Sequence, residues 1–401
     1  MSARRPLDGV LVVDASRMLP GAVLVRTLVD LGARVVKVED PAGGDVLRGT
    51  PPLVDGLGAA FLAFFRGTES VALDLRSAPG AAAFRRLARH ADVLVESFRP
   101  GTLERWGLGL GDLSRTNPGL VTLSLSGFGA GNESSSRPGH DLNFSAMSGL
   151  LSLLPPGMPR IQPTDVATGM QAATALLGAL LLRERSGVGS RIEVPLAAAT
   201  LPFVAWAAVD RTVGGPSFYD GLFAGRTPCY RLYRCADGRD VAVAAMEPKF
   251  WHGLVRALGL ERLSGDGLDA GERGAAAARL LEQLFARRPS ADWVAVGRER
   301  DLPITAVATP EEALASGFFR SAGLVEGTPL PGGGELETFV SSPGPWRAGA
   351  VRPAPALGEG TARVLSSLGA SSAEIAAILG DAGGGAEGFL DGEAGNYRPR
   401  R

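Results

Sequence analysis

The stretch that decides the fold is VLVVDASRMLPGAVLVRTLVDLGARVVKVE, residues 10–39. It begins with a run of apolar, mostly β-branched residues that ends at Asp14, and it finishes with a second run of the same kind. Between the two runs, Leu24, Leu28 and Leu31 recur at the spacing that places side chains on one face of a helix. This order is typical of two parallel strands joined by a crossover helix.

The same alternation continues to about residue 130, and it predicts an α/β fold. The further elements expected are strands at 71–73, 93–95, 121–125 and 191–194, and helices at 79–90 and 165–185. Later in the chain, Asp237-Gly238 separates two short strand-like runs, a signal for a hairpin. A smaller domain is therefore expected from about residue 226 to residue 321.

Composition excludes several classes of protein. Of the 401 residues, 45% are hydrophobic and 21% are charged, which is typical of a globular chain, and the net charge of −1 favours neither nucleic acid nor an anionic membrane as a partner. The longest apolar run, residues 170–182, falls short of the roughly 20 residues that cross a bilayer. No apolar signal core follows the N-terminus, so a cytoplasmic location is expected. Two cysteines, Cys229 and Cys235, are too few for a zinc cluster, and no metal is expected.

Phosphate-binding loops are also missing from the sequence. No Gly-x-Gly-x-x-Gly pattern follows the first expected strand, and no Walker-type loop occurs. Neither a dinucleotide nor ATP is indicated, and no cofactor is expected.

Three residues attract attention as candidates for chemistry. His140 is one of three histidines and lies in a loop rich in Gly, Pro and Ser, where a catalytic role and a structural hydrogen bond are equally plausible. Asp165 precedes an apolar helix, where an N-cap is the ordinary explanation, although free N–H groups at the same helix end would stabilise an oxyanion. Glu247 stands before Pro248 at the start of another expected helix, and its position alone gives it little weight.

Several segments together resemble the class III CoA-transferase superfamily, and the resemblance covers most of the chain. The segments that carry it are Pro6-Leu7-Asp8-Gly9-Val10, Val29-Asp30-Leu31-Gly32-Ala33, Val71-Ala72-Leu73-Asp74-Leu75, Glu96-Ser97-Phe98-Arg99-Pro100-Gly101, Leu123-Ser124-Leu125-Ser126-Gly127-Phe128-Gly129 and Arg137-Pro138-Gly139-His140-Asp141-Leu142-Asn143. The resemblance implies a Rossmann-like large domain built from both chain ends, an inserted smaller α+β domain, and an interlocked homodimer. The expected parts are a first part of the large domain at 1–200, a linker at 201–225, a small domain at 226–321, a return linker and the rest of the large domain at 322–382, and a flexible tail at 383–401.

The resemblance also implies where an acyl-CoA substrate binds. The residues concerned are Ser16, Lys37, Arg66, Arg76, Ser97, Phe98 and Arg105. The sequence departs from the family pattern at two places: Thr68-Glu69 follows Arg66-Gly67 where a basic residue is usual, and Ser97 stands where Asn is common. Arg76 or another arginine is then expected to take over phosphate binding.

Within the superfamily, the alpha-methylacyl-CoA racemase branch carries a histidine in Gly-His-Asp and a glutamate in a Glu-Pro-x-Phe segment, which His140 and Glu247 match. The transferase branch uses an aspartate as covalent carrier of CoA, and Asp165 matches that position as well. The resemblance thus implies a racemase that interconverts (2R)- and (2S)-2-methylacyl-CoA through a thioester enolate. His140 and Asp165 would be the two bases and Glu247 would orient His140. A CoA transferase using Asp165 and a non-catalytic acyl-CoA-binding scaffold remain as alternatives.

Overall fold

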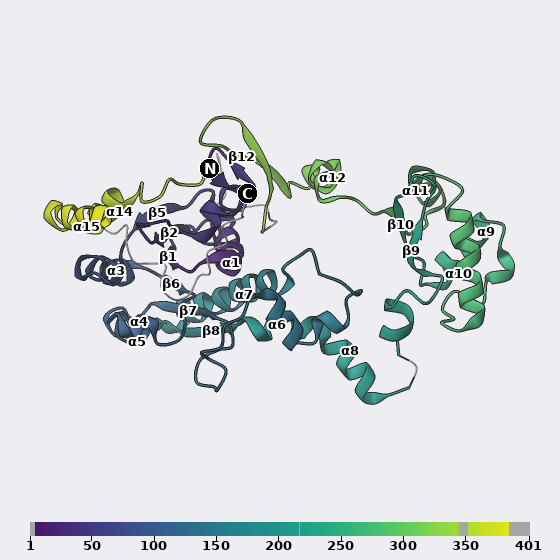
Figure 1. Ribbon diagram of the computed structural model, residues 1–401, viewed down its shortest axis with the longest axis horizontal. Helices are drawn as coiled ribbons and strands as arrows, with labels where there is room; N and C mark the ends of the chain where they lie inside the picture. The colour runs from purple at the N-terminus through teal and green to yellow at the C-terminus, as the bar shows by residue number, and fades with distance from the viewer. Residues whose placement is uncertain (1–4, 216, 343, 345–351, 385–401) are drawn as a thin grey trace. The chain divides into compact units, whose positions relative to one another are not determined.

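The computed structural model describes residues 5–215, 217–342, 344 and 352–384, so the expected tail lies outside the described residues from 385 onward. By its internal contacts the chain divides into two compact units (Figure 1). Unit 1 consists of Met1–Phe203 and Gly317–Arg401, and unit 2 is Val204–Ser316. The segment expected to be a linker contains a helix, α8 (Leu201–Val213), which crosses the boundary between the two units.

Unit 1 is built on a parallel sheet of six strands in the order β5-β2-β1-β6-β7-β8. The strands are β1 (Leu11–Ala15), β2 (Arg34–Glu39), β5 (Glu69–Ala72), β6 (Val93–Glu96), β7 (Val121–Ser126) and β8 (Arg191–Pro195). From β1 the chain runs outward through β2 to β5, then returns to the other side of β1 and continues through β6, β7 and β8. The order of the strands therefore reverses between β1 and β6.

Helices cover both faces of this sheet (Figure 1). The helices of unit 1 are α1 (Met18–Asp30), α2 (Ala59–Phe65), α3 (Ala78–His90), α4 (Thr102–Arg105), α5 (Leu110–Thr116), α6 (Asp141–Met147), α7 (Pro163–Ser186), α13 (Gly317–Ser321), α14 (Thr361–Ser367) and α15 (Ser372–Gly384). Alternate strand residues face opposite layers: Val12 packs in the core with α1, α2 and α7, whereas Val13 packs in the core with α3, α5, α14 and α15. The result is a three-layer α/β/α unit.

α7 is the long helix of the first layer. Nine of its residues are buried, among them Ala172, Ala173 and Leu176 in the core beneath α1. By length and composition alone it is also the one described helix that could cross a membrane, with a mean hydropathy of 1.4 over its best window. Its buried residues pack in the core of unit 1, and a core helix of a globular unit meets the same criteria of length and composition.

The end of the chain completes the sheet at its β5 edge. The backbone N–H of Gly360 donates to the carbonyl oxygen of Ser70 at 2.9 Å, and the hydroxyl of Thr361 accepts from the N–H of Ala72 at 3.0 Å. Two short hairpins also belong to unit 1, namely β3 (Leu53–Val54) with β4 (Leu57–Gly58) and β12 (Val325–Pro329) with β13 (Glu335–Phe339). Residues from both ends of the chain therefore share one core.

Unit 2 contains an antiparallel sheet in the order β11-β10-β9. Its elements are β9 (Tyr230–Arg234), β10 (Asp240–Ala244), α9 (Pro248–Ala257), α10 (Glu272–Phe285), α11 (Ser290–Arg300), β11 (Ile304–Ala306) and α12 (Pro310–Ala315). β9 and β10 form the expected hairpin around Asp237-Gly238. In the core, the ring of Tyr233 stacks on Phe285 with 4.7 Å between centroids, and Cys229 and Cys235 are buried free thiols.

Candidate active site

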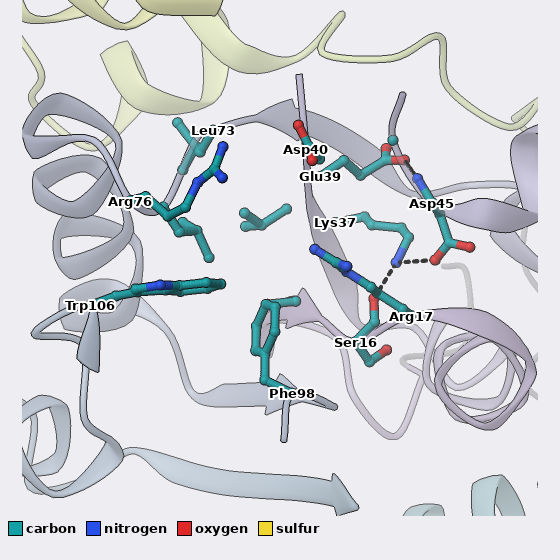
Figure 2. Close-up of a pocket in the computed structure, with 14 residues that line it drawn as sticks. Ser16, Arg17, Lys37, Glu39, Asp40, Asp45, Leu73, Arg76, Phe98 and Trp106 are labelled. Atoms are coloured by element: carbon teal, nitrogen blue, oxygen red, sulfur yellow. Dashed lines mark hydrogen bonds and ion pairs between the residues drawn. The ribbon is translucent and has the colours of Figure 1, made fainter. Parts of the chain in front are cut away.

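A pocket lies at the carboxyl ends of the strands of unit 1, where the strand order reverses between β1 and β6 (Figure 2). Parallel α/β sheets bind ligands at this position because the loops after the two diverging strands separate there. Its lining comes from the carboxyl ends of β1 and β2 and from the segments that follow β1, β2, β5 and β6. The residues are Ala15, Ser16, Arg17, Lys37, Val38, Glu39, Asp40, Gly44, Asp45, Leu73, Leu75, Arg76, Phe98 and Trp106.

Lys37 forms the floor of the pocket and is held by ion pairs. Its Nζ lies 3.0 Å from Oδ2 of Asp45 and donates to the carbonyl oxygen of Ser16 at 2.9 Å (Figure 2). The same Nζ lies 3.1 Å from Oδ2 of Asp14. Burial alone would lower the pKa of Lys37, but these two carboxylates and Glu39 raise it above its ordinary value. Lys37 is therefore a buried cation that is already neutralised by protein carboxylates.

Aromatic rings and an arginine form one wall of the pocket. Phe98 and Trp106 meet edge to face with 5.2 Å between ring centroids, and the guanidinium of Arg17 lies 5.3 Å from the centroid of Phe98. The backbone N–H of Arg17 donates to Oγ of Ser97 at 2.8 Å, and the N–H of Phe98 donates to a carboxylate oxygen of Glu96 at 2.7 Å. These bonds fix the loops after β1 and β6, so the wall is set before any ligand arrives.

Arg76 supplies a second guanidinium, on the opposite side of the pocket from Arg17 (Figure 2). Its side chain is 43% exposed and pairs with Asp74, with 3.0 Å between Nε and Oδ1. The two arginines and the flat rings of Phe98 and Trp106 suit a ligand that has both a planar group and anionic groups.

The structure brings four of the seven predicted CoA-binding residues into this pocket. Ser16, Lys37, Arg76 and Phe98 line it, and Ser97 stands behind the wall through its bond to Arg17. The other two lie elsewhere in unit 1.

Arg66 and Arg105 do not line the pocket. The side chain of Arg66 is fully buried, where it pairs with Glu326 and donates to the carbonyl oxygens of Phe339 and Ala63. It therefore holds the β12–β13 hairpin to the rest of unit 1. Arg105, at the end of α4, donates to Oγ1 of Thr102 at 2.9 Å.

His140 lies at the same edge of the sheet, at the end of the loop that follows β7. It is the N-cap of α6, its backbone N–H donates to Oδ1 of Asn143 at 3.1 Å, and its side chain is exposed. The loop before it is anchored near its start, because Glu193 on β8 accepts from Oγ of Ser126 at 3.1 Å and from the N–H of Ala130 at 2.5 Å. The imidazole is thus presented to solvent from an anchored loop.

Asp165 is in the first turn of α7, and the expectation that it caps this helix is wrong. The N-cap is Gln162, and the exposed N–H groups are capped by a residue of another helix: Oδ1 of Asp141 accepts from the N–H of Thr164 at 2.8 Å and from that of Asp165 at 2.9 Å. The expected free donors for an oxyanion are therefore already bonded at this helix end. The side-chain carboxyl of Asp165 therefore takes no part in capping α7.

Asp165 is half-buried, and burial together with the negative charge of Asp141 raises its pKa to about 7. A carboxyl group in this condition is present in both protonation states near neutral pH, so it can both accept and donate a proton. Because Asp141 directly follows His140 and bonds the backbone of Asp165, the two candidate bases stand on neighbouring helix ends of unit 1.

Glu247 belongs to unit 2. It is the N-cap of α9, has Pro248 at N1 and is exposed, as expected of a residue that precedes a helix. Its geometry within unit 2 assigns it no chemistry.

Sequence reasoning missed Arg17, Asp40, Asp45 and Trp106, all of which line the pocket. Arg17 and Trp106 directly follow Ser16 and Arg105, so their neighbours in sequence were the available signal. Among the residues that the structure describes, no group of three or more His, Cys, Asp and Glu side chains is placed to hold a metal ion.

A pocket at the switch point of a parallel sheet, lined by arginines and aromatic rings, agrees with what comparison with known proteins finds. The model of CoA-transferase family III matches residues 7–361, so the chain belongs to that family. Membership makes the protein an enzyme of acyl-CoA chemistry.

Among its relatives, the human alpha-methylacyl-CoA racemase is 31% identical over 389 residues, covering 94% of this chain and 96% of the relative. A probable fatty acyl-CoA transferase from Mycobacterium tuberculosis is 32% identical over 392 residues, covering 90% and 98%. Among solved structures, a CAIB/BAIF family protein from Brucella suis has a TM-score of 0.78 at 28% identity, covering 91% of this chain and all of the other.

Proposed function

We propose that the protein is a racemase that interconverts (2R)- and (2S)-2-methylacyl-CoA. The observation that carries the proposal is the carboxyl of Asp165, whose pKa is raised to about 7 beside the helix that begins after His140. An α-proton next to a thioester is weakly acidic, and a racemase needs one proton-exchanging group for each face of the carbon. Imidazole and a carboxyl group of this pKa are both suited to that task at neutral pH.

In the reaction, neutral His140 removes the C2 proton from one face, and its electron pair becomes the enolate of the thioester. Protonated Asp165 then delivers a proton to the opposite face of C2, which gives the other enantiomer. In the reverse direction Asp165 starts as the carboxylate and the protonated imidazole is the donor. Atoms and charge balance in each direction, because one proton leaves and one returns.

The switch-point pocket is the proposed site for the nucleotide part of CoA. Arg17 and Arg76 meet phosphate groups and the rings of Phe98 and Trp106 face the adenine, while neutralised Lys37 supports the floor without contacting phosphate. Glu247 is proposed to orient His140 from the second chain of a homodimer. Support for the second chain comes from the resemblance and from exposed apolar side chains on α7, such as Met170, Leu181 and Leu182.

Exchange with deuterated water tests the reaction. Wild-type protein incubated with either enantiomer of a 2-methylacyl-CoA should place deuterium at C2 without any acceptor acid, as followed by mass spectrometry. His140→Ala should lose exchange from one enantiomer by roughly a hundredfold or more, since a general base contributes about that much. CoA affinity should change little. Absence of deuterium in both enantiomers with wild-type protein would refute the racemase.

A CoA transferase is the second candidate, because transferases are among the relatives at similar identity. In that reaction the carboxylate of Asp165 would attack the thioester carbonyl, form a mixed anhydride and release CoA thiolate. The thiolate would then attack the Asp165 carbonyl and displace the acyl acid, which leaves CoA bound to Asp165 as a thioester. Incubation with an acyl-CoA and a free acceptor acid, followed by trapping with hydroxylamine, decides the point. A modified Asp165 and exchange of CoA between acids would establish the transferase.

A further inference from the structure

One carboxylate ties together the two helices that carry the proposed bases. Asp141, the first residue of α6, is buried, and its Oδ1 accepts from the backbone N–H groups of Thr164 and Asp165 at 2.8 and 2.9 Å. Its Oδ2 lies 3.4 Å from Oγ of Ser145, which itself lies 2.8 Å from Oγ1 of Thr164. The start of α6 is thereby fixed to the first turn of α7.

With this contact in place, the backbone N–H groups in the first turn of α7 all have acceptors. Pro163 has no N–H, the next two N–H groups are bonded to Asp141, and that of Val166 bonds to the carbonyl oxygen of Gln162 at 3.2 Å. If the Asp141 carboxylate were removed, two N–H groups would lose their partner, and of the described hydrogen bonds between the two helix ends that between Ser145 and Thr164 would remain.

The same carboxylate acts on Asp165 through its charge. After burial, the Asp141 charge is the second cause of the raised pKa of Asp165. The charged residues on the other elements around α7 have partners of their own: Arg26 and Asp30 on α1 pair with each other at 2.5 Å, Glu193 on β8 bonds Ser126 and Ala130, and Arg17 lies over the ring of Phe98. His140 and Arg191 are exposed to solvent.

We propose that Asp141 is a positioning residue, which holds the backbone of Asp165 against the helix that begins after His140 and places a negative charge beside the Asp165 carboxyl. This inference rests on the proposed racemase. Asp141 itself does not touch the reacting carbon. It acts by setting the separation of the two bases and the proton affinity of one of them.

Two substitutions separate the two actions. Asp141→Asn keeps an Oδ1 acceptor for both N–H groups and can donate to Oγ of Ser145, so the local structure should remain while the charge is lost. Asp141→Ala removes both the acceptor and the charge. Asp112→Asn, which removes an exposed carboxylate from α5 in the same unit, is the control for a change of net charge.

The decisive measurement is the titration of the Asp165 carboxyl by ¹³C NMR of protein labelled at aspartate Cγ, with the Asp165 signal assigned by its loss in Asp165→Asn. In Asp141→Asn the midpoint should fall by about half a pH unit or more, since a like charge has been removed from its neighbourhood. For the enantiomer whose C2 proton Asp165 removes, the acid limb of the deuterium-exchange profile should move in the same direction. Asp112→Asn should leave both unchanged.

Asp141→Ala should lose roughly tenfold or more in the maximal rate of exchange with little change in KM, because the bases are displaced while the CoA pocket is not. An unshifted Asp165 titration in Asp141→Asn, or wild-type exchange in a folded Asp141→Ala, would overturn the proposal. If wild-type protein exchanges no deuterium, the racemase fails, and the NMR titration still decides the effect of Asp141 on Asp165.

Discussion

Asp165 shows what partial burial does to a single carboxyl group. Its side chain makes none of the cap bonds that its position suggests, and it lies close to a second aspartate, so the ionised form is penalised in the folded protein. The folded-state pKa of about 7 lies above the ordinary value of 3.8. The protein therefore binds this proton more tightly when folded, and stability falls as pH rises through the window between those two values.

Replacement of Asp165 by Asn should remove this pH-dependent cost. At pH 8 the variant should be more stable than wild type by about 1–2 kcal/mol, a figure already reduced for solvent screening of a half-buried group. At pH 4, close to the unfolded-state pKa of 3.8, Asp165 is protonated in the folded protein and only about half ionised in the unfolded chain, so most of the difference in stability should disappear. Urea unfolding at the two pH values measures the difference, and equal stabilities at pH 8 would contradict the raised pKa.

Lys37 and Arg76 make a second comparison between residues. Both were expected to contact CoA, yet one is buried between Asp14 and Asp45 and the other is 43% exposed beside Asp74. Removing a buried partner leaves carboxylates uncompensated, whereas removing an exposed cation does not.

Lys37→Met should therefore destabilise the fold by about 3–5 kcal/mol. Arg76→Ala should leave the unfolding midpoint nearly unchanged and weaken CoA binding about tenfold or more, which is the contribution of one charge-assisted hydrogen bond. Calorimetry with CoA and chemical unfolding of both variants provide the test. Should Lys37→Met fold as well as wild type and lose CoA instead, the lysine would be a phosphate ligand after all.

At the scale of elements, the crossing of α1 and α7 determines the position of Asp165 relative to Arg17, which lines the pocket just before α1. α7 passes α1 at Gly169, one turn after Asp165, where an added Cβ would lie 2.6 Å from Cβ of Val23 and 2.7 Å from the carbonyl oxygen of Pro20. Pro20 follows Arg17 of the pocket by three residues. The close approach of these helices therefore depends on the absence of a side chain at Gly169.

Gly169→Ala should separate the two helices, with a loss of about 1–3 kcal/mol in stability from overpacking. Exchange activity should also fall, although Gly169 carries no side chain to react. Gly178→Ala in the same helix is the matched control, because a Cβ there meets nothing within 4 Å and should stabilise the helix by about 0.5–1 kcal/mol. If both variants behave alike, helix propensity and not the crossing determines the effect.

The strands of the fold could be predicted from the sequence, whereas contacts between residues far apart in the chain could not. Strands β1, β2, β6 and β7 lie where apolar runs predicted them, since burial on both faces leaves a local signature. β5 begins two residues before its expected run, and the edge strand β8 is only partly buried. The cap of α7 was not predictable, because Asp141 lies 24 residues away in sequence from the N–H of Asp165. The burial of Arg66 depends on Glu326, which is 260 residues further along the chain.

At the scale of the whole molecule, the candidate residues fall in two units. His140 and Asp165 belong to unit 1 and Glu247 belongs to unit 2, and the proposed homodimer would complete each site with the partner's Glu247. A site shared between chains can be restored by mixing two different defects. In such a dimer, His140 and Glu247 of the same chain would belong to two different sites.

Co-expression of His140→Ala and Glu247→Gln chains with different affinity tags should therefore recover activity in the isolated heterodimer. One of its two sites would carry both substitutions and the other would be intact, so about half of wild-type activity per dimer is expected. Each homodimer should remain impaired. A heterodimer no more active than the two homodimers, or a wild-type protein that sediments as an active monomer, would contradict the shared site.

The closing of the β5 edge by residues near Gly360 and Thr361 has a consequence for biosynthesis. A ribosome releases the strands of the sheet long before it releases the segment that bonds to Ser70 and Ala72. Until then β5 exposes unpaired backbone groups, a template for association with another nascent chain. The whole of unit 2 is made during this interval, so we expect the nascent chain to be most prone to association before the segment around Gly360 is released.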